Sequence, residues 1–190
     1  MLESTTSGNF TFTKTPIDGV VVVQPKLFPD ERGVFAEAYK QCDFNAGGIA
    51  DVFVQENQST SLHGVLRGLH YQWRHQQSKL VRVLYGEAFD VAVDLRPGSP
   101  TFGQWYGEVL SADNGKQLYM PCGCAHGILI LSDKAVFAYK SNDVYHPNSE
   151  AGIAWNDPTI GVEWPLPVNE VITSAKDKML PSFKAAFCSF

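Results

Sequence analysis

Turn-forming residues interrupt this chain at intervals of roughly eight to fifteen residues, and this spacing limits the folds that it can adopt. The turn sequences are PIDG, FPDERG, NAGG, RPGSP, ADNG, PCG, HPNSE and NDPTIG. The segments between them are short and rich in Val, Ile, Leu, Phe and Tyr, as is typical of β-strands. The clearest expected strands are VVVQPKLF (21–28), KLVRVLYG (79–86), AFDVAVDL (88–95), QWYGEVL (104–110), KQLYMP (116–121) and AVFAYKS (135–141).

Helical signals are weak. One short helix is expected in EAYKQCDFNAGG (37–48), ending at its two glycines, and another near SAKDKML (174–180), where Ser174 is placed to cap it. Many short strands without a βαβ rhythm predict an all-β protein, an antiparallel barrel or a double-sheet jelly roll with a few short helices. We expect one domain over residues 1–190, with residues 1–12 as a flexible or strand-pairing N-terminal arm.

The composition narrows the function classes. A net charge of −5 argues against a general nucleic-acid binder, while a few local arginines could still hold a small anion. No apolar run is long enough to cross a membrane and the N-terminal segment is polar, so we expect a cytoplasmic protein. Four cysteines without zinc-site spacing are expected to be free thiols: Cys42, Cys122, Cys124 and Cys188.

The segment GVLRGLHYQ (64–72) places polar side chains in an otherwise apolar strand. In a regular strand, Arg67 and His70 would lie on opposite faces, because side chains alternate. A bulge at Gly68 would bring them to the same face, and glycine within a strand often marks a bulge. We therefore expect this strand to line a ligand cavity.

Acid–base chemistry is the function that these residue types favour. Histidine is the usual general base near neutral pH, and it usually needs a carboxylate to fix its tautomer. His70 and His126 both lie beside apolar strand residues and glycine. The candidate carboxylates are Asp90, Asp94, Asp157 and Asp177, and the sequence does not choose among them. Tyr139 is either a general acid or a core tyrosine with its hydroxyl at the rim.

Other chemistries have weaker support. No HxH pair is present, so no metal is expected, although two histidines far apart in sequence could still meet in space. The absence of GxSxG argues against a serine hydrolase, and the absence of GxGxxG and GxxxxGK[ST] argues against the common nucleotide-binding folds.

Several long motifs occur in a fixed order along nearly the whole chain, from about Thr13 to Asp177 and beyond. They are LFPDERGVFAEAY, FVQENQS, RGLHYQ, SKLVRVLYGEAFDVAVDLRPGSPTFGQW, PCGCAHGILIL, YKSNDVYHP and WNDPTIGVEWP. Together they resemble the dTDP-4-dehydrorhamnose 3,5-epimerase family. The resemblance implies a cupin-type jelly-roll barrel, a homodimer that exchanges N-terminal strands, a dTDP-linked 4-keto sugar as substrate, and no cofactor.

The resemblance also implies roles for individual residues. His70 would be the catalytic base with Asp177 as its partner, Tyr139 the acid on the opposite face of the sugar, and Lys79 the cation beside the C4 keto oxygen. The residues implied in substrate binding are Arg67 at the diphosphate, Arg32 reaching from the partner subunit, Gln55 and Asn57 at the nucleotide or sugar, Tyr145 at the base or sugar, His126 in the pocket wall, and Phe28 and Glu37 packing on thymine from the neighbouring chain.

The chain departs from the usual family pattern at some positions. Cys124 and Ile128 stand in PCGCAHGI where phenylalanines are usual, and the loop WRHQQS lacks the usual small residues before Lys79. None of these departures removes a proposed catalytic residue, but they leave the identity of the sugar substrate open. The resemblance implies inversion at both C3 and C5, and alternatives to it remain. They are a single-position epimerase or another relative acting on a nucleotide-linked 4-keto sugar, a noncatalytic sugar-nucleotide-binding barrel, and a metal-dependent dioxygenase of the same fold.

Overall fold

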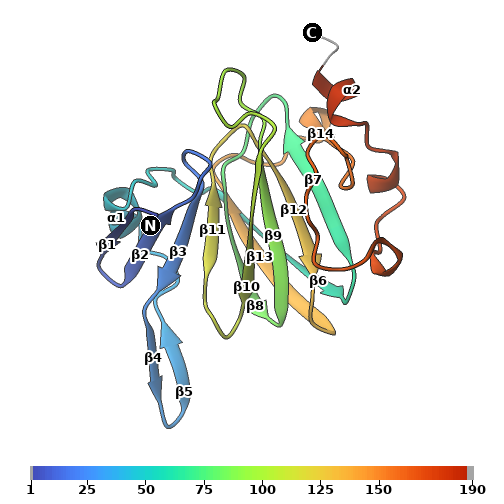
Figure 1. Ribbon diagram of the computed structural model, residues 1–190. Coiled ribbons are helices and arrows are strands. Elements are labelled where there is room, and N and C mark those ends of the chain that lie inside the picture. Colours follow the sequence, from blue (N-terminus) through green and yellow to red (C-terminus); the bar gives the residue numbers. More distant parts are fainter. Residues whose placement is uncertain (1, 188–190) are drawn as a thin grey trace.

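A computed structural model describes residues 2–187 and contains two antiparallel sheets packed against each other (Figure 1). The seven-stranded sheet has the order β1-β2-β3-β11-β8-β13-β6, and the five-stranded sheet has the order β10-β9-β12-β7-β14. This is the expected double-sheet architecture. The strands are β1 (Ser4–Ser7), β2 (Phe10–Lys14), β3 (Val21–Pro25), β4 (Leu27–Asp30), β5 (Gly33–Ala36), β6 (Gln55–Leu62), β7 (Leu66–Gln72), β8 (Lys79–Tyr85), β9 (Glu87–Asp94), β10 (Trp105–Ser111), β11 (Gln117–Met120), β12 (Cys124–Ile130), β13 (Lys134–Ser141) and β14 (Glu150–Gly152).

The helical segments are short, as expected. They are α1 (Gln41–Ala46), η1 (Pro147–Ser149), η2 (Val168–Glu170), η3 (Asp177–Met179) and α2 (Phe183–Phe187). The helix expected near residues 174–180 is only a 3₁₀ turn, η3. Ser174 is not its N-cap, because η3 begins at Asp177 with Lys176 in that position and has no side-chain cap. Ser174 Oγ still accepts the backbone N–H of Asp177 at 3.0 Å. The expected strand 21–28 is divided into β3, which pairs with β2, and β4, which pairs with β5.

The main apolar core lies between the two sheets. It combines residues of the seven-stranded sheet, such as Val81 and Leu118, with residues of the five-stranded sheet, such as Ala92 and Ile128. The outer face of the five-stranded sheet is covered as well, because its outward apolar residues pack against the C-terminal segment that carries Trp164, Phe183 and Phe187. None of the helices that the structure describes is long and apolar enough to cross a membrane.

The N-terminal residues form strands, which corresponds to the strand-pairing alternative of the expected arm and not to the flexible one. β1 and β2 make a hairpin, and β2 pairs with β3. Phe10 and Phe12 are buried, and their rings lie 5.0 and 5.3 Å from the ring of Phe44 in α1. Burial of large aromatic side chains explains why this polar-looking segment is ordered. Met1, the first residue of the expected arm, lies outside the described residues.

Cys42, Cys122 and Cys124 are free thiols, as expected, and Cys188 lies outside the described residues. The Cys124 side chain is buried in the main core, and burial raises the pKa of its thiol to about 12. Its packing role therefore fits the expectation for a buried cysteine.

A β-bulge interrupts β7, as the sequence predicts. Arg67 is in register with Ile128 of β12, and the next registered pair is His70 with His126. Two residues of β7 therefore oppose one residue of β12, which places the bulge at Gly68. Both Arg67 and His70 line the same cavity as a result.

Replacing Gly68 by alanine is expected to lower the free energy of unfolding by about 2–4 kcal/mol, through a strained backbone and overpacking. Gly68 has a φ of 145°, and a Cβ atom there would lie 2.6 Å from Gly127 Cα. Urea unfolding measures the change. Gly33→Ala is the matched control, since Gly33 has a φ of 134° with nothing within 4 Å of its Cβ position. Equal losses in the two variants would show that the contact with Gly127 adds nothing.

Candidate active site

A cavity of about 540 Å³ opens between the two sheets at one end of the barrel. Its walls come from β6, β7, β8, β12 and β13 and from the segment that precedes and enters η3. The lining residues are Asn57, Gln58, Ser59, Val65, Leu66, Arg67, His70, Lys79, His126, Ile128, Phe137, Tyr139, Ile172, Thr173, Ser174, Lys176 and Asp177. The size suits a small organic ligand, and the lining mixes apolar residues with several convergent polar groups.

His70 and Asp177 form a hydrogen-bonded pair in this cavity, with His70 Nε2 2.7 Å from Asp177 Oδ1. They are 107 positions apart in the sequence and meet because η3 packs on β7. Asp177 is only 5% exposed, and its backbone is held by Ser174. Burial lowers the pKa of the His70 imidazole, while hydrogen bonding to Asp177 opposes the shift. A neutral imidazole held by a carboxylate is suited to accept a proton.

A second histidine–carboxylate pair lies beside the first, because His126 is in register with His70 on the neighbouring strand. His126 Nε2 lies 2.8 Å from Asp90 Oδ2. Asp90 is fully buried, and burial raises the pKa of its carboxyl group against the opposing effect of His126. Its Oδ1 atom is buried and has no hydrogen-bond partner within the described part of the chain.

The four candidate carboxylates have different hydrogen-bond partners in the structure. Asp177 pairs with His70 and Asp90 with His126. Asp94 instead accepts hydrogen bonds from Arg96, Ser99 and Thr101, and these bonds hold its pKa well below its usual range. Asp157 accepts backbone N–H groups of residues 159, 160 and 183. The last two carboxylates therefore order loops and lie outside the cavity.

Lys79 and Tyr139 line the wall formed by the seven-stranded sheet, which faces the wall that carries His70. Lys79 Nζ lies 5.6 Å from the centre of the Tyr139 ring. Burial lowers the pKa of the Lys79 ammonium to about 8 and raises the pKa of the Tyr139 hydroxyl. The cavity thus offers a proton acceptor on one wall, with a neutral phenol and a cation on the other.

Arg67 extends into the cavity from β7, and Asn57 lies opposite Tyr139 in the β6–β13 pairing. The Nε and Nη2 atoms of Arg67 donate to Ser61 Oγ at 3.2 and 3.1 Å. No carboxylate in the described structure forms an ion pair with Arg67, so its charge remains available for an anion. A guanidinium group matches phosphate oxygens well.

Gln55 and Tyr145 lie next to each other beyond the cavity lining. The backbone N–H of Tyr145 donates to Gln55 Oε1 at 3.0 Å, and the Tyr145 hydroxyl donates to Glu150. Glu150 also pairs with Lys176 at 2.6 Å, and Lys176 lines the cavity. The two predicted residues therefore connect to the rim of the cavity and are not part of its interior.

Phe28, Arg32 and Glu37 do not line this cavity. Phe28 and Arg32 belong to the β4–β5 hairpin, which extends away from the two sheets (Figure 1). The Arg32 side chain is 84% exposed and pairs with Asp30, and Glu37 accepts a hydrogen bond from Asn9. Their expected action across a subunit boundary stays a prediction.

The sequence did not single out Ser59, Ser61 and Lys176, although the first and third line the cavity and the second holds Arg67. A signal was available for the two serines. QENQSTSL (55–62) alternates in burial while its inward residues are all polar, so a search for apolar alternation misses it. For Lys176, the only sequence signal was its position next to the candidate carboxylate Asp177.

Known proteins that are similar to this chain belong to the family that the sequence motifs resemble. The family model described as dTDP-4-dehydrorhamnose 3,5-epimerase matches residues 14–185. A protein of that name from Pseudomonas aeruginosa is 50% identical over 177 residues, which cover 93% of this chain and 97% of the relative. The crystal structure of a dTDP-6-deoxy-D-glucose-3,5-epimerase from Legionella pneumophila, in complex with dTDP-4-keto-L-rhamnose, superposes with a TM-score of 0.90. It is 47% identical and the match covers 95% of this chain and 96% of that one.

A more distant structure, a 3'-monoepimerase from Streptomyces bikiniensis in complex with dTDP-quinovose, has a TM-score of 0.82 at 30% identity, with 88% of this chain and 85% of that chain covered. The family match spans nearly the whole chain and includes every strand and loop segment that builds the cavity. The chain belongs to the dTDP-4-dehydrorhamnose 3,5-epimerase family.

Proposed function

We propose that this protein inverts C3 and C5 of a dTDP-linked 4-keto-6-deoxyhexose without a cofactor, as a step in the biosynthesis of a rhamnose-type deoxysugar. The observation that carries the proposal is the placement of His70 with Asp177 on one wall of the cavity and Tyr139 with Lys79 on the facing wall. Inversion at carbon needs proton removal on one face and proton return on the other, and this arrangement provides both.

The reaction follows from the acidity of the substrate. The hydrogens at C3 and C5 both lie next to the C4 carbonyl, so removing either one gives an enolate whose negative charge collects on the keto oxygen. His70 would accept the proton, with Asp177 steadying the imidazolium that forms. Lys79 would stabilise the enolate oxygen, and a fixed cation aimed at charge that develops in the transition state is often the largest catalytic contribution. Tyr139 would then donate a proton to the opposite face of the carbon.

The remaining residues suit the nucleotide part of the substrate. Arg67 has no carboxylate partner among the described residues and would bind the diphosphate through its planar donors. Asn57 and His126 line the cavity and would contact the sugar, while Gln55 and Tyr145 would contact the nucleotide at the rim. This division of roles is supported by the positions of Asn57 and His126 inside the cavity and of Gln55 and Tyr145 beyond its lining.

We further propose that residues 1–190 form one domain and that the protein acts in the cytoplasm as a homodimer. In this dimer the N-terminal strands are exchanged, and Phe28, Arg32 and Glu37 of each subunit complete the site of the other. The β4–β5 hairpin supports this, because Val34 and Phe35 in β5 are 64% and 70% exposed although they are apolar. Sedimentation analysis tests the dimer. A monomer that retains full activity would overturn the proposed assembly and leave the reaction itself unaffected.

The reaction is tested by proton NMR of the purified protein with dTDP-4-keto-6-deoxyglucose in D₂O. Deuterium incorporation at both C3 and C5, lost in a His70→Gln variant, supports double inversion with His70 as the base. Incorporation at one carbon alone would identify a single-position epimerase. Binding of the nucleotide sugar without any incorporation above the variant would identify a noncatalytic barrel and overturn the proposal.

The pH profile of kcat/KM is expected to be bell-shaped, because the free enzyme needs a neutral His70 and a charged Lys79. The pKa of His70 is lowered from 6.5, so activity should persist below pH 6.5 and fall only as His70 becomes protonated. Above a pH of about 8, Lys79 loses its charge and activity should fall again. Lys79→Arg keeps the charge at high pH and should remove the alkaline limb from whatever activity remains. An unchanged alkaline limb in that variant would assign it to another group.

A further inference from the structure

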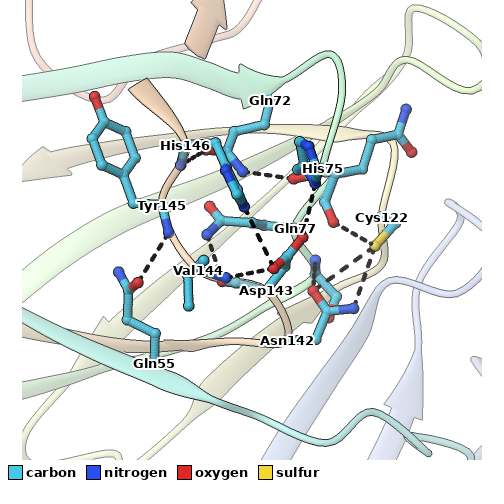
Figure 2. A network of polar contacts seen from close by, with 12 residues as sticks. Gln55, Gln72, His75, Gln77, Cys122, Asn142, Asp143, Val144, Tyr145 and His146 are labelled. Atoms are coloured by element: carbon cyan, nitrogen blue, oxygen red, sulfur yellow. Dashed lines mark hydrogen bonds and ion pairs between the residues drawn. The ribbon is translucent and has the colours of Figure 1, made fainter. Parts of the chain in front are cut away.

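Two loops outside the cavity bring together His75, Asp143 and His146 (Figure 2). One ligand atom of each residue lies within 4.8 Å of the others. His75 Nδ1 is 3.6 Å from Asp143 Oδ2, and His146 Nε2 is 3.8 Å from Asp143 Oδ1. The two imidazole rings stack with their centres 3.9 Å apart. None of the three residues lines the catalytic cavity.

The backbone around this cluster is held by amide side chains. Gln72, which is 6% exposed, donates from Nε2 to His75 O at 2.6 Å and accepts the backbone N–H of His146 at 2.7 Å. Gln77 Nε2 donates to Asp143 O at 2.7 Å. Figure 2 shows these side chains bridging the two loops. The three side chains are therefore carried on a backbone that is fixed by strong contacts, although they come from positions about 70 residues apart.

The imidazole nitrogens of the cluster are not used by other groups, whereas Asp143 Oδ1 accepts the backbone N–H of Val144 at 2.7 Å. Within residues 2–187, the rings of His75 and His146 make no hydrogen bond, since the distances to Asp143 exceed hydrogen-bond length. The guanidinium group of the adjacent Arg74 stacks on Trp73 at 4.2 Å and so has a partner other than Asp143. His75 has a φ of 52°, a conformation that is uncommon for a residue other than glycine.

We propose that His75, Asp143 and His146 bind a divalent transition-metal ion, with zinc as the best fit and water completing the coordination. Two imidazoles and one carboxylate are a common ligand set for Zn²⁺, with bonds of about 2.0–2.2 Å. Tetrahedral ligands at that bond length are about 3.3 Å apart, which is close to the separations of 3.6 and 3.8 Å in the cluster. The side chains are 35% to 55% exposed, so the two imidazole rings can turn out of their stacked arrangement and direct their in-plane lone pairs at one ion without disturbing the core.

This site is separate from the proposed catalysis. The neighbouring pocket, of about 280 Å³, lies over residues 73–75 and 146–149 and shares no lining residue with the catalytic cavity. Mg²⁺ and Ca²⁺ are not expected to compete, since both prefer oxygen ligands and the cluster offers two nitrogens. Bound metal should join the two loops and raise the midpoint of thermal unfolding, because ligands that bind only the folded state stabilise it.

The test uses full-length protein without an affinity tag, stripped of metal with a chelator and dialysed. Calorimetric titration with Zn²⁺ is expected to show one tight equivalent, and Mg²⁺ none. His75→Ala and His146→Ala should each weaken zinc binding by at least about tenfold, and Asp143→Asn should weaken it too. His63→Ala is the matched control, because His63 is also an exposed loop histidine near a carboxylate but lies outside the cluster. It should bind zinc as the unmodified protein does.

A second measurement locates the ion independently of how well the variants fold. Titration with paramagnetic Ni²⁺ should selectively broaden the amide NMR signals of residues 73–76 and 143–146 in the unmodified protein. Broadening centred on His70 and His126 would overturn the proposal, and so would equal zinc affinity in a His75→Ala/His146→Ala double variant. Absence of any tight zinc equivalent in the unmodified protein would overturn it as well.

Discussion

Replacing His70 by glutamine is expected to lower kcat/KM by roughly 10²–10⁴-fold, the usual loss when a proton-transfer group is removed. Glutamine is chosen because its amide can still donate to Asp177. Asp177 is 5% exposed, and a buried carboxylate left without its partner would cost about 1–3 kcal/mol of stability. Steady-state assays measure the loss of activity, and urea unfolding shows whether the fold is retained.

His63→Gln is the matched control for this substitution. The His63 ring lies at the surface, where Nδ1 is 2.9 Å from Leu131 O, and it should tolerate the same change with full activity. If His70→Gln keeps its fold and retains more than about a tenth of the activity, His70 is not the base, because no general base contributes so little.

Replacing Tyr139 by phenylalanine is expected to separate proton exchange from inversion. His70 can still remove a proton and return one to the same face, so deuterium should enter the substrate with its configuration retained. The inverted product should form roughly 10²–10⁴-fold more slowly, because the opposite wall then lacks a donor. Proton NMR in D₂O follows exchange and configuration in the same sample.

Tyr71→Phe removes a tyrosine hydroxyl group from β7 in the other sheet, at a side chain that does not line the cavity and whose ring stacks on Phe187 at 6.1 Å. It should invert the substrate at the normal rate. Should Tyr139→Phe lose exchange and inversion in equal proportion, Tyr139 would be needed to form the enolate, and its assignment as the acid for the second face would fail.

The strand positions were largely predictable because turn residues mark their ends. The segment AFDVAVDL alternates between an apolar face and a face bearing carboxylates. Which face points inward was not predictable. Val91 and Val93 pack under the C-terminal segment, while Asp90 points into the barrel and pairs with His126. In most barrels the apolar face is the inner one, but here a polar cavity and an outer covering segment change that.

Only part of the catalytic cluster could be predicted from the sequence. The bulge at Gly68 could be inferred locally, since a glycine interrupts a strand with two polar residues. Family resemblance, and not spacing, selected Asp177 from four carboxylates, because that choice depends on a contact across 107 positions. The cluster of His75 and His146 was missed for the same reason, because their neighbours in sequence give no sign that the two loops meet.

The bulge in β7 also determines what would be needed to move this site into another barrel. The backbones of Gly68 and Gly127 on β12 approach so closely that a Cβ atom on Gly68 would lie 2.6 Å from Gly127 Cα, and a Cβ atom on Gly127 would lie 2.8 Å from the Leu69 side chain. Grafting β7 alone onto a host strand would therefore place its arginine and histidine against a neighbour that cannot accept the extra residue. The smallest transplantable unit is the strand pair β7–β12, together with the segment that delivers Asp177.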